Sequence, residues 1–315
     1  MTRPSRRQVL QFAAVSATAI SIPPSGNLFA DKKTESKASE SGWLKKTLKI
    51  GMIRMKGSLT DKFNLAKEAG FEGVELNAPR INVEEATAAA KESGMIIDGT
   101  VGGYHWQTRH TDPDPDVRKK AMGLLKQGLK DTAAVGGESM LLVPGHGKDG
   151  SDDEVYERAV AAVKEALPVA EECKVAILIE NVWNDFCYDH EGGGDQTADR
   201  LAAFIDEFDS PLVGMQYDIG NHWKYGDPAK WIRTLGKRIQ KLDIKGFKRN
   251  GPKPGFTKIT EGDIDWPSVE KALQDIGFTG WLAAEVGGGG LDRLTEVSDH
   301  LEEALHCSKS MASVN

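Results

Sequence analysis

Short apolar runs alternate with longer segments of helical spacing along most of this chain. Eight such pairs follow one another between residues 48 and 307 of this 315-residue chain. The expected strands span residues 48–55, 73–77, 95–101, 139–145, 175–181, 212–218, 239–246 and 280–286. The expected helices span residues 60–70, 83–94, 116–135, 152–173, 197–208, 228–235, 266–277 and 291–307. Strict alternation of this kind predicts parallel strands joined by helical crossovers.

Eight strand–helix units over about 260 residues match the size of a (β/α)8 TIM barrel. An open doubly wound sheet is the alternative. No Gly-x-Gly-x-x-Gly motif opens the first strand–helix turn, and the glycine run at residues 287–290 lacks that spacing, so the dinucleotide-binding version has no support. We therefore predict one α/β domain, a TIM barrel, over residues 47–310.

The first thirty residues have the pattern of an export signal. Arg6 and Arg7 precede an apolar run from residue 9 to residue 22, which is too short to span a bilayer comfortably. The start resembles a bacterial twin-arginine signal, so we expect a periplasmic or otherwise exported protein without a stable membrane anchor. The alternative is a cytosolic tail with two chance arginines. Residues 31–46, rich in Lys, Ser and Glu, are expected to form a flexible linker.

Charge and cysteine content exclude some classes of partner. The formal net charge is −7, and removal of residues 1–30, which carry three arginines and no acids, would make it −10. An acidic chain of this kind argues against a nucleic-acid partner. The three cysteines form no Cys-x-x-Cys pair, so a thiolate zinc site is not indicated. A homo-oligomer is left open.

Carboxylates stand at or near the carboxyl ends of five of the expected strands. In chain order they are Glu75, Glu180, Asp218, Asp243 and Glu285. The chemistry of a TIM barrel occurs at this end of its strands, and four acids from neighbouring strands would crowd there. Like charges that close need a cation, and oxygen ligands favour Mn²⁺ or Mg²⁺. The alternatives are that Asp243 pairs only with Lys241 or Lys245, and that Glu75 is a salt-bridged strand-end acid.

Several segments resemble the sugar phosphate isomerase/epimerase superfamily, the xylose-isomerase-like barrels. They are GFEGVEL (70–76), ILIEN (177–181), QYDIGNH (216–222), KLDIKGF (241–247) and GDIDWPSVEKALQDIGFTGWLAAE (262–285). The resemblance implies a TIM barrel with one divalent metal, often Mn²⁺, with Mg²⁺ or Zn²⁺ as alternatives. It places the ligands at Glu180, Asp218, Asp243 and Glu285. It also implies that Glu180 and Glu285 act as an acid–base pair, and that Arg249 contacts substrate.

The chain departs from the family pattern at three positions. Asp243 stands where the family usually has His, although an oxygen ligand is tolerated there in some members. Asn221 stands where epimerases often place a substrate-binding His, with His222 next to it. Phe186 stands where the epimerases carry a second acid. A particular epimerase therefore cannot be assigned from the sequence.

The resemblance implies chemistry through an enediolate. A metal that holds a keto-sugar makes its α C–H more acidic, one carboxylate removes the proton, and the other returns it. Return to the other face gives epimerisation, and return to the adjacent carbon gives isomerisation. Lys245 or Lys241 would neutralise the oxyanion. The same enediolate can expel a leaving group, so the second hypothesis is a lyase or dehydratase that acts on 3-keto sugars or keto-glycosides. The third hypothesis is a non-catalytic sugar-binding barrel.

Residues of the loops that follow the strands are candidates to contact the sugar. Export argues for a free or oxidised sugar, because sugar phosphates are scarce outside the cytoplasm. Aromatic side chains at the mouth would suit stacking on a sugar face. The expected substrate-binding residues are Glu75, His105, Trp183, His222 and Arg249.

Overall fold

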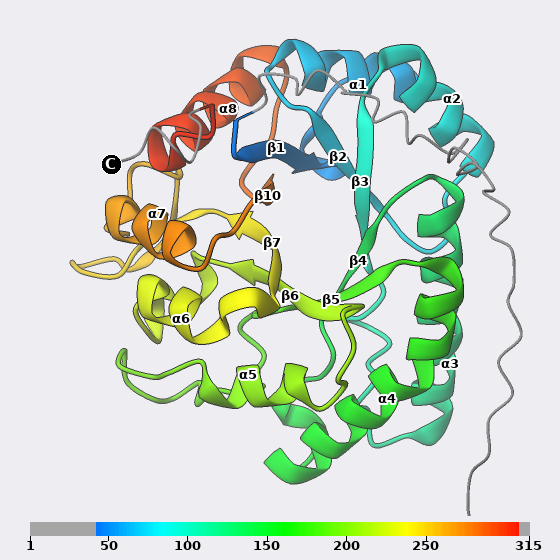
Figure 1. Ribbon diagram of the computed structural model, residues 1–315, viewed down its shortest axis with the longest axis vertical. Coiled ribbons are helices and arrows are strands. Elements are labelled where there is room, and N and C mark those ends of the chain that lie inside the picture. The colour runs from blue at the N-terminus through cyan, green and yellow to red at the C-terminus, as the bar shows by residue number, and fades with distance from the viewer. Residues whose placement is uncertain (1–41, 309–315) are drawn as a thin grey trace, which may run out of the picture. The chain divides into compact units, whose positions relative to one another are not determined.

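A computed structural model of the protein describes residues 42–308, and eight of its strands close into one parallel barrel (Figure 1). The barrel strands are β1 (Leu44–Lys49), β2 (Gly73–Asn77), β3 (Ile96–Val101), β4 (Ser139–Leu142), β5 (Ala176–Glu180), β6 (Val213–Asp218), β7 (Ile239–Ile244) and β10 (Gly280–Ala284). Neighbours in the sheet follow chain order, and β10 closes the barrel against β1. The predicted (β/α)8 barrel is confirmed, and an open sheet is excluded by this closure.

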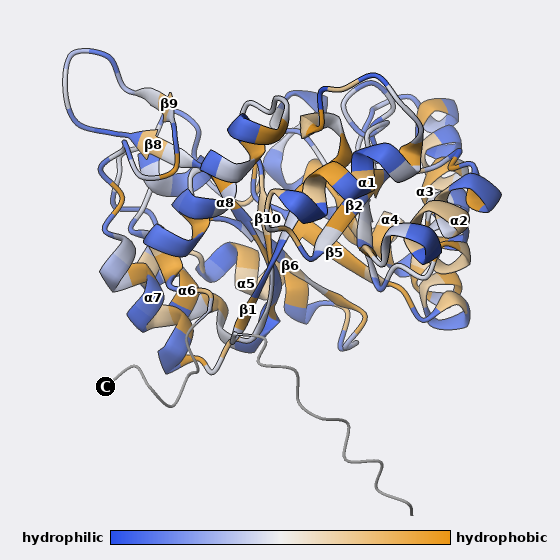
Figure 2. Cartoon of the chain, turned by 90° about the horizontal axis from the view of Figure 1, so that it is seen from above, coloured by the Kyte–Doolittle hydropathy of each residue, from blue (hydrophilic) through white to orange (hydrophobic). Residues whose placement is uncertain are grey.

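A layer of eight helices surrounds the strands among the residues described. They are α1 (Leu59–Glu68), α2 (Val83–Ser93), α3 (Pro115–Ala134), α4 (Asp152–Cys173), α5 (Asp199–Asp206), α6 (Pro228–Leu235), α7 (Trp266–Asp275) and α8 (Leu291–Leu305). Ser58 and Ser151 begin α1 and α4 with capping boxes, and Gly94 ends α2 in the left-handed conformation. The helices in Figure 2 are banded in hydrophilic and hydrophobic colours, as expected for elements with one face on the core.

The first strand begins earlier than the predicted residue 48. Residues 44–46, assigned in advance to the linker, belong to β1, and the predicted end of that strand is a 3-10 turn at Ile50–Met52. The two lysines that interrupt the apolar pattern both have partners: Lys45 lies 5.1 Å from the ring centre of Trp281 on β10, and Lys46 donates a 2.8 Å hydrogen bond to Ser298 on α8. The predicted linker is also wrong at Trp43, which is buried and donates a 3.2 Å hydrogen bond to the carbonyl oxygen of His306. The predicted signal over 1–30 and linker residues 31–41 lie outside the described residues.

A short antiparallel hairpin, which the alternation did not predict, follows β7. It consists of β8 (Gly246–Lys248) and β9 (Gly255–Thr257), and it projects from the barrel in Figure 2. Gly246 is required there, because a Cβ atom would lie 1.9 Å from the carbonyl oxygen of Lys258. The hairpin brings Phe256 close to the end of β7.

Within residues 42–308, no helix combines the length and the apolar character needed to cross a membrane.

Candidate active site

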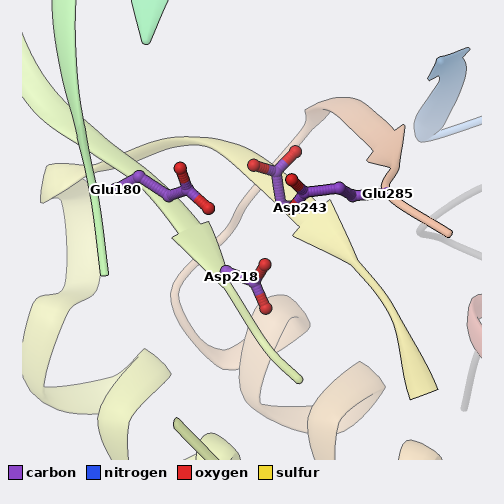
Figure 3. A group of neighbouring side chains, drawn as sticks. All are labelled: Glu180, Asp218, Asp243 and Glu285. Carbon is purple, nitrogen blue, oxygen red and sulfur yellow. The ribbon is translucent and has the colours of Figure 1, made fainter. Parts of the chain in front are cut away.

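Four carboxylates converge at the carboxyl end of the barrel. Glu180 ends β5, Asp218 ends β6, Asp243 lies near the end of β7, and Glu285 follows β10. Each offers one oxygen atom such that all four atoms lie within 4.8 Å of one another (Figure 3). The register of the barrel explains the meeting, because Asp218 and Asp243 are directly paired on β6 and β7.

Burial and mutual repulsion disfavour the charged forms of three of these acids. Burial raises the pKa of Asp218 from 3.8 to about 8 and the pKa of Asp243 from 3.8 to about 6. Burial, followed by the charges of Glu285 and Asp243, raises the pKa of Glu180 well above its usual range. Glu285 differs, because Lys49 and Lys245 hold its pKa below the usual value although burial opposes them. A group of acids in this state favours an additional positive charge.

The acids are held in place by neighbouring amides. The Asn181 side chain brackets the backbone of Asp218: its Nδ2 donates to the carbonyl oxygen at 2.8 Å, and its Oδ1 accepts from the N–H at 2.8 Å. The backbone N–H of Asn221 donates to Asp218 Oδ1 at 2.7 Å. The other oxygen, Asp218 Oδ2, and the Oε2 atom of Glu285 are both buried, and each lies within ion-pair distance of the same ammonium group, that of Lys245.

Two lysines reach the cluster. Lys245 places its Nζ 2.8 Å from Asp218 and 2.7 Å from Glu285. Lys49, at the end of β1, places its Nζ 3.1 Å from Asp243 and 3.3 Å from Glu75. Lys241, the other lysine considered in the sequence besides Lys245, is buried and pairs with Glu75 at 2.8 Å and with Asp98. Lys241 therefore belongs to a buried layer inside the barrel, together with Glu75 and Asp98.

Glu75 lies in that inner layer, with no exposed surface. Its carboxylate accepts hydrogen bonds from Lys241 at 2.8 Å and from Gln216 at 3.0 Å, and Lys49 reaches it from above. Although burial opposes ionisation, Lys241 and Lys49 lower the pKa of Glu75 to about 2. Gln216 joins the two layers, because its Nε2 also donates to Asp243 at 2.9 Å. These contacts agree with the alternative in which Glu75 is a salt-bridged strand-end acid. Among the described residues, its partners are buried or partly buried side chains inside the barrel.

The donor set fits a divalent cation. It consists of four carboxylates without thiolate or imidazole, which suits a cation that prefers oxygen ligands. Within the described chain, the ion pairs of the four acids come from two ammonium groups, those of Lys245 and Lys49, which leaves negative charge for a cation to balance. A cation there would also relieve the repulsion that, after burial, contributes to the raised pKa values of Glu180, Asp218 and Asp243. The cluster could therefore bind a metal, through the four residues that the sequence indicated.

An aromatic surface borders the cluster on the side of the β8–β9 hairpin. Trp183 stacks on Phe256 with ring centres 5.1 Å apart, and its Nε1 donates to the carbonyl oxygen of Asn221 at 2.6 Å. The two rings remain 36% and 52% exposed. Lys245 lies 5.3 Å from the centre of the Phe256 ring, so this surface adjoins the acids directly.

The remaining predicted substrate contacts lie in different surroundings. His105 is buried, accepts a 3.3 Å hydrogen bond from the Val143 N–H, and has a pKa lowered to about 3 by burial and then by His110 and Lys49. His222 is also buried, and its ring packs on Tyr188 and Trp231.

Arg249 donates to the carbonyl oxygen of Gly194 at 2.9 Å and lies over the ring of Trp223. The described contacts of Arg249 and of His222 are with neighbouring loops and helices, and none is with the four acids.

Four residues of the site were not among the candidates taken from the sequence. They are Lys49, Gln216, Asn221 and Phe256. Lys49 was hidden because the first strand was predicted to start at residue 48, which placed this lysine at the wrong end of it. Gln216 shares the inward face of its strand with Asp218, and that alternation was the available signal for it. Phe256 lies on a hairpin for which the alternating pattern gave no signal.

Comparison with known proteins gives a family and its relatives. The family model for the xylose isomerase-like TIM barrel matches residues 63–310. D-psicose 3-epimerase of Ruminiclostridium cellulolyticum is 29% identical over 240 residues, which cover 71% of this chain and 77% of that protein. An uncharacterized protein of Methanocaldococcus jannaschii is 24% identical over 173 residues, which cover 54% of this chain and 57% of that protein.

Solved structures share the fold. The 3-keto-D-glucoside 4-epimerase YcjR of E. coli has a TM-score of 0.67 at 19% identity, with 83% of this chain and 98% of that chain covered. The IolI protein, solved with a bound zinc atom, has a TM-score of 0.67 at 13% identity, with 83% and 98% covered. Sugar epimerases are thus among the relatives, and the chain belongs to the family of xylose isomerase-like TIM barrels.

Proposed function

We propose that this protein is a metal-dependent epimerase or isomerase of a keto-sugar that works through an enediolate. The observation that carries the proposal is the cluster of four carboxylates within 4.8 Å at the barrel mouth. The name of the curated relative, a D-psicose 3-epimerase, supports the choice of reaction and substrate class. A divalent ion held by Glu180, Asp218, Asp243 and Glu285 would supply positive charge for the oxygen atoms of the enediolate.

In this proposal, Glu180 and Glu285 form the acid–base pair. They come from strands separated in the barrel by β6 and β7, and Figure 3 shows Glu180 on one side of the group and Glu285 on the other. A ketose held between them would present opposite faces of its α-carbon to the two carboxylates. One takes the proton from carbon, and the other returns a proton to the opposite face or to the adjacent carbon.

Lys245 and the aromatic surface supply the remaining functions. The Lys245 ammonium, between Asp218 and Glu285, can donate to an oxygen of the substrate that becomes negative as the proton leaves. Trp183 and Phe256 offer apolar faces for the C–H side of a sugar ring. His105, buried at the base of the loop after β3, would form part of the wall.

Metal content is the first test. The full chain, purified gently and supplied with Mn²⁺, should hold about one ion per chain by mass spectrometry. The Glu180→Gln, Glu285→Gln double variant should lose it, because two of four ligands become neutral. Glu191→Gln, at an exposed loop position, is the matched control. An absence of metal in the wild-type protein would contradict the proposal and favour a sugar-binding barrel without catalysis.

We further propose that residues 1–30 direct export and that the substrate is a free or oxidised sugar outside the cytoplasm. The support is the paired Arg6 and Arg7 ahead of the apolar run. Cell fractionation should find the shortened protein in the periplasm, and an Arg6→Lys, Arg7→Lys variant should stay in the cytoplasm. Equal distribution of the two proteins would contradict the proposal.

A further inference from the structure

Lys49 contacts both carboxylate oxygens of Asp243, one of the four clustered acids. It is the last residue of β1, and its Nζ donates to both oxygens of Asp243, each at 3.1 Å. The same atom lies 3.3 Å from Glu75, and the side chain is only 15% exposed. An ammonium placed against both oxygens of one carboxylate fixes the orientation of that carboxylate as well as its charge.

The charges of the site divide into three groups, each with its own lysine. Lys241 forms ion pairs with Asp98 and Glu75 in the inner layer, and Lys245 forms ion pairs with Asp218 and Glu285 at the mouth. Within residues 42–308 the ion pair of Asp243 is with Lys49. Glu75 keeps Lys241 if Lys49 is removed, whereas Asp243 would keep only the neutral amide of Gln216. Asp243 therefore depends on Lys49 more than any other acid of the cluster does.

We propose that Lys49 is the positioning residue for Asp243, and that the two side chains act as one charge-balanced unit that lets a fourth carboxylate lie in the cluster. A buried carboxylate beside three others costs free energy unless a cation accompanies it. The paired Lys49 meets that need from the strand on the far side of β10, because β1 and β7 both flank β10. In a pair of this kind, either side chain destabilises the folded protein when its partner is removed.

The proposal is tested by a double-mutant cycle on the full chain, with Lys49→Met, Asp243→Asn and the combined variant. Thermal unfolding in EDTA measures how much the Lys49–Asp243 pair contributes to stability when no metal is bound. Lys49→Met should lower the midpoint by on the order of 5–10 °C, because Asp243 is left buried without its partner. The combined variant should regain most of that loss. Lys91→Met, on the exposed face of α2, is the matched control, and Lys49→Arg should behave nearly as wild type.

Calorimetric titration with Mn²⁺ supplies the second readout, which rests on the proposed metal centre. Asp243→Asn should weaken Mn²⁺ binding by about 100-fold, because a ligand is lost while the Lys49 charge stays beside the ion. Removing Lys49 as well should restore about tenfold of that affinity. A purely structural lysine would give no such recovery.

The outcomes separate the two proposals. The paired unit is wrong if the decreases in unfolding midpoint of the two single variants simply add in the combined variant. It is also wrong if Lys49→Met lowers the midpoint no more than Lys91→Met does. If the losses are coupled but the combined variant binds Mn²⁺ no better than Asp243→Asn, the positioning of a ligand is wrong and only a structural pair remains. If the wild-type protein binds no Mn²⁺, the metal centre is wrong and the unfolding cycle still decides the pair.

Discussion

Lys245 holds its ammonium nitrogen 2.7 Å from a carboxylate oxygen of Glu285. This contact places a fixed positive charge beside the acid proposed to exchange protons with the substrate. Lys245→Met should therefore lower kcat by roughly 100-fold or more while Mn²⁺ still binds, because the charge that forms on oxygen loses its partner. Steady-state kinetics and Mn²⁺ titration measure both effects. Lys248→Met, three residues along on the exposed side of the hairpin, is the control, and equal kcat values for the two variants would refute this role.

The stability of the metal-free protein should fall as the pH rises from about 4 to 8. Burial raises the pKa of Asp218 from 3.8 to about 8, so the folded state retains a proton in this window that the unfolded chain has lost. The free energy of unfolding decreases with pH wherever the folded state binds more protons. Urea unfolding in EDTA between pH 5 and 8 measures the slope. Asp218→Asn should reduce it, and a slope that is flat in the wild-type protein would contradict the raised pKa.

Affinity for Mn²⁺ should change with pH in the opposite direction. The ion displaces the proton of Asp218, so binding should tighten as the pH rises toward 8. Calorimetry in two buffers of different ionisation enthalpy should detect the released proton at pH 7. Binding that releases no proton would show that Asp218 is already ionised or is not a ligand.

The inner ion layer should matter for stability more than any surface pair. Lys241→Met leaves Glu75 and Asp98 buried without their shared cation, and should cost about 3–5 kcal/mol in the free energy of unfolding. Lys271→Met removes an exposed partner of Asp275 and should cost less than about 1 kcal/mol. Urea denaturation compares the two variants. Similar losses would mean that the buried network contributes no more than a surface contact.

The aromatic surface should affect substrate binding more than turnover. Phe256→Ala or Trp183→Ala should raise KM by about 3- to 10-fold with little change in kcat, because stacking on the sugar is lost in the ground state and the transition state alike. Ile96→Ala removes an equally exposed apolar side chain at the start of β3 and serves as the control. If Phe256→Ala and Trp183→Ala leave KM as unchanged as the control does, the sugar does not rest on these rings.

The barrel and the four clustered acids followed from local signals in the sequence. Each acid ends an apolar run or lies near its end, and parallel strands bring such positions to one rim. The start of β1 could not be predicted in this way, because Lys45 and Lys46 interrupt the apolar pattern while their side chains find partners on α8 and β10. For the same reason, the sequence did not indicate Lys49 as a residue of the site.

The surroundings of single residues were harder to predict than the cluster. His222 follows a strand end, yet the 3-10 turn at Asn221–Lys224 directs its ring against α6, where it packs on Trp231. Glu75 lies two residues before the end of β2, one layer deeper than the cluster. The β8–β9 hairpin depends on long-range packing of Phe247 and Phe256 around Trp183, which no local periodicity encodes.

Hydrogen exchange between a keto-sugar and deuterated water tests the enediolate mechanism itself. The Mn²⁺-loaded protein is incubated with a panel of ketoses and 3-keto glycosides, and mass spectrometry follows deuterium bound to carbon beside the carbonyl. Deuterium should be incorporated into at least one substrate by the wild-type protein, and into none by Glu180→Gln or Glu285→Gln. Incorporation together with loss of a leaving group would favour the lyase. A metal-loaded wild-type protein that exchanges no substrate hydrogen faster than the two variants would contradict the enediolate mechanism.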